Sequence, residues 1–408
     1  MKRSIAIFLS FVLVLASCAM LTACNNKKSD FKVGAIYIGS QNDTAGYTFA
    51  HHDGIVKAMK QLGLSVEDDL KIVDNVPEDY TAVTNAIDTL AGQGCKIIFG
   101  ISFGYINAFD DAAKKDEYKD IIFSHATGYL SNEDNFNNYF GRIYQARYLS
   151  GIVAGLKSLE VGNNNIGYVA AWGTEYAETC SGINAFALGV QSVNPDAVVH
   201  VKKISTWGDE SLERQAAEIL IDTYNCCVIA QHCDSAQPQL VANEKGMFGC
   251  GYNTDMTTQA PDAHLTAPIW HWDVYYKLAI ETAMNNPDDF MKDVGIYYGG
   301  LKEGFVDISP LSKNCTADAA EKVAAVRSLI ESGEWDVFLN VKLSFDTNGN
   351  IVKTTAALLD NKGNTVITTD SKLYITKADG TLEEVTAEGV DSLIKGSMNY
   401  YVAGVIEE

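Results

Sequence analysis

The sequence predicts a two-lobed α/β protein in which helices flank parallel β-sheets. From residue 32 onward, short β-branched and aromatic runs alternate with stretches of helical period, which is typical of βαβ units. The chain has 408 residues, more than one hydrophobic core usually serves. A Gly/Asn break at residues 162–165 interrupts the alternation near its middle and favours two open sheets over one closed barrel.

The predicted elements follow one another in a regular order. The strands are expected at residues 33–38, 71–73, 96–99, 120–124, 165–170, 198–204, 226–229 and 247–251. The helices are expected at residues 48–62, 80–92, 105–114, 145–156, 175–193, 210–223 and 237–244. Beyond about residue 346 the Asn348-Gly349 and Asp379-Gly380 pairs indicate type I′ hairpins, so we expect a small C-terminal β elaboration on one lobe.

The N-terminus has the pattern of an export signal. Lys2 and Arg3 precede an apolar run, and residues 1–23 end in Leu21-Thr22-Ala23-Cys24, which resembles a bacterial lipobox. We expect Cys24 to be lipidated and residues 24–30 to form a polar tether. Cys18 also fits the lipobox pattern, but apolar residues follow it. These features predict a lipid-anchored protein on the extracytoplasmic face of the cell membrane.

Composition and cysteine spacing exclude several classes of function. The net charge of −21 comes without basic stripes, which argues against nucleic-acid binding. The sequence contains no Gly-Lys dipeptide and therefore no Walker A loop. The seven cysteines after Cys24 are unpatterned, and the group Cys226-Cys227 to Cys233 lacks a Cys-x-x-Cys pair. We therefore expect small buried thiols, no metal site and no cofactor.

Aromatic and polar residues recur directly after the predicted strands. They are Tyr47 and Thr48 after the first strand, Thr127 after the fourth, Trp172 after the fifth, Trp207 after the sixth, Asp234 after the seventh and Asp255 after the eighth. In open parallel sheets, ligands bind beyond the carboxyl ends of the strands. Aromatic faces with a few carboxylates suit a flat, uncharged heterocycle, and each stacked base contributes about 1–3 kcal/mol. Sugar rings also stack on aromatics, so this pattern leaves a sugar open.

Longer segments resemble the basic membrane protein family of substrate-binding lipoproteins. They include Gly46-Tyr47-Thr48-Phe49-Ala50-His51-His52-Asp53-Gly54, Arg147-Tyr148-Leu149-Ser150-Gly151, Gln231-His232-Cys233-Asp234-Ser235 and Gly251-Tyr252-Asn253-Thr254-Asp255-Met256. The order and spacing match from about residue 33 to 310, whereas residues 351–389 match least.

The resemblance implies the type I periplasmic-binding-protein fold, with three crossings between lobes. One lobe would hold residues 31–143 plus about 252–295, and the other about 144–251 plus about 296–350. Residues from about 351 to 408 would form a β-hairpin extension and a C-terminal segment.

The resemblance also implies a function. Characterised members bind purine nucleosides or bases for import, with an ABC permease and ATPase as partner subunits. Tyr47 and Trp207 look like the two aromatics that sandwich the purine, with Thr48 and Thr127 as polar contacts nearby. Asp234 and Asp255 look like acceptors for N–H groups or a ribose.

One departure bears on the ligand. Nucleoside-binding members carry a ribose-binding lysine where this chain has Trp270. A tryptophan there would fill the ribose space or add a stacking face, which favours a free base such as adenine over a nucleoside. Trp172 and His271 are further candidate contacts.

Two other functions compete with import. Closed lobes could signal to a membrane partner, and the sequence does not separate such a sensor from a transporter. The pentad from Gly100 to Gly104 places Ser102 in the strand-to-helix context of a serine hydrolase. It lacks an oxyanion segment and an evident histidine–acid pair, so no catalytic residue is expected and the protein is predicted not to be an enzyme.

Overall fold

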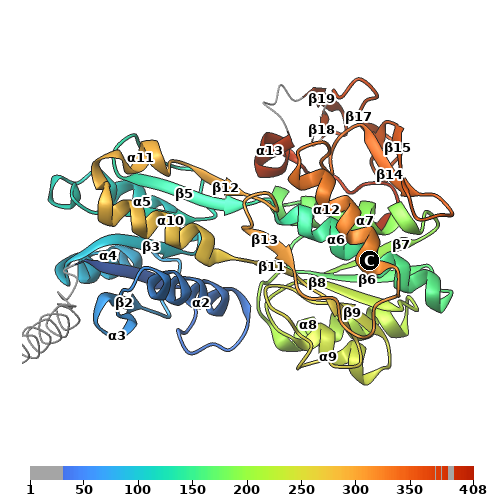
Figure 1. Cartoon of the computed structure of the whole chain (residues 1–408), viewed down its shortest axis with the longest axis horizontal. Coiled ribbons are helices and arrows are strands. Elements are labelled where there is room, and N and C mark those ends of the chain that lie inside the picture. The colour runs from blue at the N-terminus through green and yellow to red at the C-terminus, as the bar shows by residue number, and fades with distance from the viewer. Residues whose placement is uncertain (1–30, 373, 378, 385–389) are drawn as a thin grey trace, which may run out of the picture.

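The computed structural model describes residues 31–372, 374–377, 379–384 and 390–408. Two six-stranded sheets, each parallel throughout, form two lobes side by side (Figure 1). The predicted signal, the tether and Cys24 lie outside the described residues. Of the helices in the described part, none is both long and apolar enough to span a membrane.

The first sheet has the strand order β12-β5-β4-β3-β1-β2. Its strands are β1 (Lys32–Tyr37), β2 (Leu70–Val73), β3 (Cys95–Ile101), β4 (Ile122–Ala126), β5 (Phe136–Gly141) and β12 (Tyr297–Gly299). Alternate residues of β1 enter different cores: Val33 and Ala35 pack with α2 (Gly46–Gln61) and α10 (Trp272–Asn285), whereas Ile36 packs with α4 (Tyr80–Gly92) and α5 (Ile106–Ala113). Helices thus cover both faces, as a parallel sheet requires.

The second sheet has the order β10-β9-β8-β6-β7-β20. Its strands are β6 (Asn165–Ala170), β7 (Val198–Lys203), β8 (Val228–His232), β9 (Phe248–Cys250), β10 (His264–Thr266) and β20 (Val405–Glu407). One face carries α8 (Glu210–Asp222) and α9 (Gln237–Glu244), and the other carries α6 (Ile143–Val161) and α7 (Ala177–Val193). The middle of α6 is buried on all sides, which explains its nearly continuous run of apolar and small residues.

Three crossings join the lobes. The chain passes from β5 to α6, from β10 through β11 (Pro268–Trp270) to α10, and from β12 to β13 (Val306–Ile308). Between the lobes, β11 and β13 pair antiparallel, as Figure 1 shows at the centre of the molecule. These crossings confirm the two-lobed α/β architecture.

The C-terminal part lies on the second lobe. After α12 (Ala319–Glu331), three hairpins follow: β14 (Val341–Phe345) with β15 (Ile351–Thr355), β16 (Leu358–Leu359) with β17 (Thr365–Ile367), and β18 (Tyr374–Thr376) with β19 (Leu382–Glu384). The short elements α3 (Val66–Asp69), α11 (Phe290–Asp293) and α13 (Val390–Ser392) complete the chain. The predicted turn at Asn348-Gly349 joins β14 to β15, and Gly349 has a φ of 84°.

The eight predicted strands and seven predicted helices all form, but some lobe boundaries differ from the expectation. Residues 252–295 were expected in the first lobe, yet β10 pairs with β9 in the second sheet. Residues 296–350 were expected in the second lobe, yet β12 pairs with β5 in the first sheet. The C-terminal β20 is likewise a strand of the second sheet rather than part of an extension. Three-residue strands carry too little periodicity to reveal such pairing.

Candidate functional site

The carboxyl ends of the two sheets meet at Gly46 and Asp234. A Cβ added to Gly46, at the start of α2, would lie 3.2 Å from the carbonyl oxygen of Asp234, which follows β8. Gly46 also has a φ of 82°, in the left-handed region that favours glycine. The loops after β1 and β8 therefore touch across the cleft, and the lobes are in contact there.

Tyr47 and Thr127 form the wall of the first lobe. The Tyr47 hydroxyl is buried and lies beside the side chain of Thr127. Burial, and next the proximity of Tyr252 and Asp234 in the other lobe, raise the pKa of Tyr47 well above its usual value. Thr127 has a φ of 63°, a strained conformation for a β-branched residue that is concentrated at functional sites. Thr48 is buried, and its hydroxyl accepts the Gly39 N–H at 3.2 Å, so it braces the loop.

An aromatic series runs from Tyr47 into the hinge. The Tyr47 ring lies 4.3 Å from His51, His51 stacks on Trp272 at 3.8 Å, and Trp272 stacks on Trp270 at 4.5 Å. The indole N–H of Trp270 donates to the Tyr252 hydroxyl at 3.2 Å, and Trp270 is only 7% exposed. Trp270 is therefore a packed hinge residue beside the cleft.

Trp207 forms the wall of the second lobe. Its side chain is 41% exposed, and its ring lies 5.7 Å from that of His232, which in turn lies 4.8 Å from Tyr252. The Trp207 carbonyl accepts the Asp234 N–H at 2.9 Å. Trp207 thus presents a partly exposed indole beside His232.

The two predicted aspartates have different surroundings. Asn253 donates to the Asp234 carboxyl at 3.1 Å, and burial, with the nearby Glu213, raises the pKa of Asp234 to about 7. Asp255 is 45% exposed and accepts the Thr257 N–H at 2.9 Å, so it fixes a local turn. Among the described residues, Asp255 has its recorded contacts outside the cleft wall.

The remaining candidates are peripheral. Trp172 packs at 5.3 Å against the exposed Tyr176 in the loop after β6. His271 precedes α10, and its Nε2 lies 3.9 Å from Asp307 in the hinge. The structure gives neither residue a contact with Tyr47 or Trp207 in the part of the chain that it describes.

Ser102 does not make the serine–histidine contact that serine hydrolysis requires. The Ser102 hydroxyl donates to Glu78 at 2.5 Å, and the Gly104 N–H donates to the same carboxylate at 2.7 Å. His125 contacts the main-chain carbonyl of Ser102 at 2.8 Å rather than its hydroxyl. Ser102 is therefore not aligned with a histidine base.

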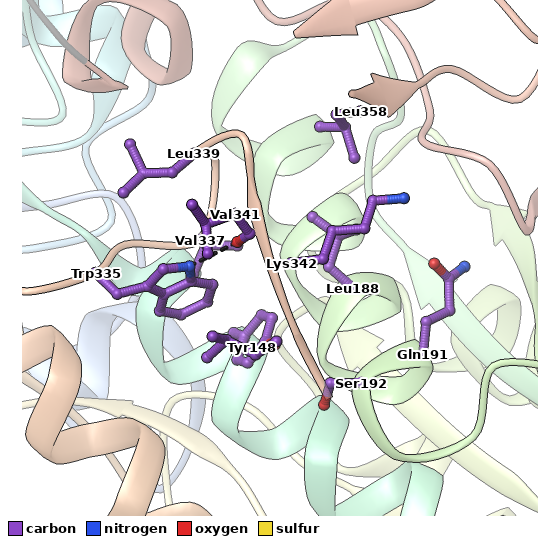
Figure 2. A pocket seen from close by; sticks show the side chains of 11 residues that line it. Tyr148, Leu188, Gln191, Ser192, Trp335, Val337, Leu339, Val341, Lys342 and Leu358 are labelled. Atoms are coloured by element: carbon purple, nitrogen blue, oxygen red, sulfur yellow. Dashed lines mark hydrogen bonds between the residues drawn. The ribbon is translucent and has the colours of Figure 1, made fainter. Parts of the chain in front are cut away.

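A small cavity lies elsewhere in the second lobe. Figure 2 shows it between α6, α7 and the β14 segment, lined by Tyr148, Leu188, Trp335 and Val341 among others. Its volume is about 60 Å³, far below the roughly 300–1,000 Å³ of small-molecule sites. Within the described ranges no cluster of three or more metal-ligating side chains occurs.

Sequence reasoning missed three polar residues at the carboxyl edge of the second sheet. Arg147 and His232 are almost completely buried, and the Glu178 side chain is 26% exposed beside them. Arg147 and His232 lie within the motifs already singled out, but only the tertiary structure shows that their side chains converge with Glu178. The signal in the sequence was an arginine that comes just before the mostly apolar and small-residue stretch 148–156 of α6.

Comparison with known proteins identifies the family. The family model described as ABC transporter substrate-binding protein, PnrA-like, matches residues 31–337. The chain belongs to this family. This result confirms the resemblance of its motifs to the basic membrane proteins, and the family is one of substrate-binding proteins rather than enzymes.

Two curated proteins and one solved structure are similar to this chain. A purine-binding protein of Brucella abortus is 36% identical over 80% of this chain and 89% of its own. A putative ABC transporter glucose-binding protein of Haloferax volcanii is 36% identical over 59% of each chain. A solute-binding protein of an ABC transporter from Conexibacter woesei has a TM-score of 0.60 at 18% identity, covering 75% of this chain and 98% of that one, which supports the fold.

Proposed function

We propose that this family member is a lipid-anchored, extracytoplasmic receptor that captures a purine and delivers it to an ABC importer. The observation that supports the ligand assignment is that Tyr47 on one lobe and the partly exposed Trp207 indole on the other both lie near Asp234. Asp234 and its partner Asn253 are polar groups that can orient a flat heterocycle. Cys24 would anchor the receptor, and permease and ATPase subunits would be its partners.

A purine fits these residues better than a hexose. The purine-binding relative covers 80% of this chain and the glucose-binding relative 59%, so the purine relative shares more of the two lobes. Trp270, which the resemblance puts where nucleoside-binding members carry a ribose-binding lysine, is a nearly buried indole stacked on Trp272. We therefore propose a free base such as adenine as the ligand, in preference to a nucleoside.

The proposed mechanism is closure around the ligand. In an open state each lobe offers one aromatic face, and only the closed state stacks both faces of the base between Tyr47 and Trp207. Ligand binding would therefore stabilise the closed state. The permease would recognise that state, which couples capture to delivery.

Replacement of Trp207 by alanine tests the assignment. Because one stacking face is lost, adenine affinity in isothermal titration calorimetry should fall about tenfold to a hundredfold, or roughly 1–3 kcal/mol. Tyr80→Ala is the matched control, because Tyr80 is also an exposed aromatic but lies on α4 and donates to Asp111. Unchanged affinity in Trp207→Ala would contradict the proposed site.

Titration of wild-type protein with adenine, adenosine and glucose separates the candidate ligands. We expect adenine to bind most tightly. Binding of glucose alone would overturn the purine assignment while leaving the family membership intact.

A further inference from the structure

The three residues missed in the sequence form one cluster, which we call the Glu178 cluster (Arg147, Glu178 and His232). Arg147 comes from α6, Glu178 from the first turn of α7, and His232 from the end of β8. His232 Nε2 lies 3.3 Å from Glu178 Oε1. A Cβ on Gly182, one turn after Glu178, would lie 3.3 Å from His232 Nδ1 and 3.5 Å from Arg147 Nε, so α7 packs closely on both.

The cluster holds polar atoms that are buried but unsatisfied. Apart from the His232 imidazole at 3.3 Å, Glu178 Oε1 has no recorded polar partner within the described chain, although the Glu178 side chain keeps 26% of its surface exposed. Arg147 donates one N–H to the Gln231 carbonyl at 2.6 Å, and its Nε and Nη2 have no recorded partner there either. Because buried polar groups are nearly always hydrogen-bonded, these atoms of Glu178 and Arg147 are available to a further polar group.

The charges of the cluster make Glu178 an acceptor. Burial alone would raise the pKa of Glu178, but His232 and Arg147 outweigh it and hold this pKa below its usual value. Burial and then the Arg147 charge lower the pKa of His232, whereas the neighbouring Glu178 carboxylate raises it. The cluster therefore presents an ionised carboxylate beside a guanidinium and an imidazole.

Tyr252 places the cluster at the candidate ligand space. Its ring lies 4.8 Å from His232 and 4.1 Å below the Arg147 guanidinium. Besides burial, the charges of Glu178 and Asp234 both raise the pKa of Tyr252, so both carboxylates act on the same ring. His232 lies 5.7 Å from the Trp207 ring and 3.3 Å from Glu178, and thus links the Glu178 carboxylate to the proposed stacking residue.

We propose that Glu178 accepts the ring N–H of a free purine base at the nitrogen that carries the sugar in a nucleoside, an inference that rests on the proposed purine ligand. A free base has this donor and a nucleoside does not. A charged acceptor strengthens such a hydrogen bond, and a ligand without the N–H leaves the buried carboxylate unpaired. Glu178 would then select base over nucleoside, as Trp270 does by volume.

Adenine and 9-methyladenine are the probes, because the methyl group removes this donor and adds far less volume than the sugar that Trp270 would exclude. By calorimetry, wild type should bind adenine about tenfold to a hundredfold more tightly than 9-methyladenine. Glu178→Met keeps the bulk but removes the oxygens, so this ratio should fall to near one. Glu178→Gln retains a neutral acceptor and should give an intermediate ratio. The ratio is measured within each variant and does not depend on the folded fraction.

Glu175→Gln is the control, because Glu175 lies three residues earlier and pairs with Lys203. The Glu175→Gln variant should prefer adenine over 9-methyladenine by the same ratio as wild type. If Glu178→Met kept the wild-type preference for adenine over 9-methyladenine, or if Glu178→Gln kept it undiminished, the proposed role of Glu178 would be wrong. The proposed purine ligand would not be affected. Failure of wild type to bind any purine would overturn the proposed purine ligand and this role with it.

Discussion

Asp234 joins the two lobes and the candidate ligand space through three contacts. Its N–H donates to the Trp207 carbonyl, its carboxyl accepts from Asn253, and its own carbonyl faces Gly46. Burial raises the pKa of this carboxyl to about 7, against about 3.9 for an aspartate in an unfolded chain. The folded protein therefore holds a proton on Asp234 over a range in which the unfolded chain has released it.

This difference predicts the pH dependence of stability. Between about pH 4 and pH 7 the unfolded state binds fewer protons at Asp234 than the folded state, so this group makes stability fall as pH rises and level off above about 7. The Asp234→Asn variant should therefore lose less stability than wild type as pH rises over this range. The measurement is urea unfolding of the ligand-free protein at several pH values from 5 to 8.

Asp262→Asn provides the comparison, because Asp262 forms only an exposed pair with Lys313. That variant should keep the wild-type pH profile, since exposed ion pairs contribute little. If Asp234→Asn and wild type lost stability in parallel as pH rises, Asp234 would not be the group responsible.

At the scale of elements, β20 closes an edge of the second sheet. Val405 is 1% exposed and pairs in parallel with Val199, and Glu407 pairs with Val201. Glu408 follows the strand and lies 2.6 Å from His200 Nδ1. Because an uncovered strand edge can pair with another chain, this C-terminal strand protects β7.

Truncation after Gly404 removes this protection. The free energy of unfolding should fall by about 2–4 kcal/mol, from the lost burial of Val405 and the lost ladder bonds. Urea unfolding measures the loss, and size-exclusion chromatography should reveal self-association through the exposed edge. Glu408→Gln keeps the strand and a side chain that can still hydrogen-bond His200, so it should cost less stability than the truncation. Equal stability of the truncated and full-length proteins would show that β7 needs no cover.

At the scale of the molecule, the contact between the lobes predicts how a single methyl group affects binding. Gly46→Ala strains the positive φ and drives a Cβ against Asp234, so it should weaken adenine binding about fivefold or more, roughly 1 kcal/mol. Gly63→Ala imposes similar backbone strain at a φ of 73° with nothing within 4 Å of the new Cβ.

Both variants should lose about 1–2 kcal/mol of stability from the left-handed conformation, but only Gly46→Ala should lose affinity. Thermal unfolding and calorimetry measure the two effects separately. Equal affinity in both variants would mean that closure does not bring Gly46 against Asp234 in the liganded protein.

The sequence by itself determined the local helices and strands, and the edge of the sheets at which the candidate site lies. Strand and helix periods depend on near neighbours, so eight strands and seven helices could be placed from the alternation of apolar residues. Topology then places every loop after a parallel strand at the same edge, which predicted that Tyr47, Thr127, Trp207 and Asp234 would share a cleft. The structure brings these residues to that edge from both lobes.

Only the tertiary structure decided which distant segments pair and where side chains point. The three-residue strands β10, β12 and β20 acquire their sheets from partners far along the chain, and no local period records such partners. Asp255 follows a strand like Asp234 but turns toward its own loop, whereas Glu178 joins Arg147 and His232 at the cleft. Side-chain direction and charge pairing arise from packing between elements, so the sequence indicated where a site would form and the fold selected the residues that build it.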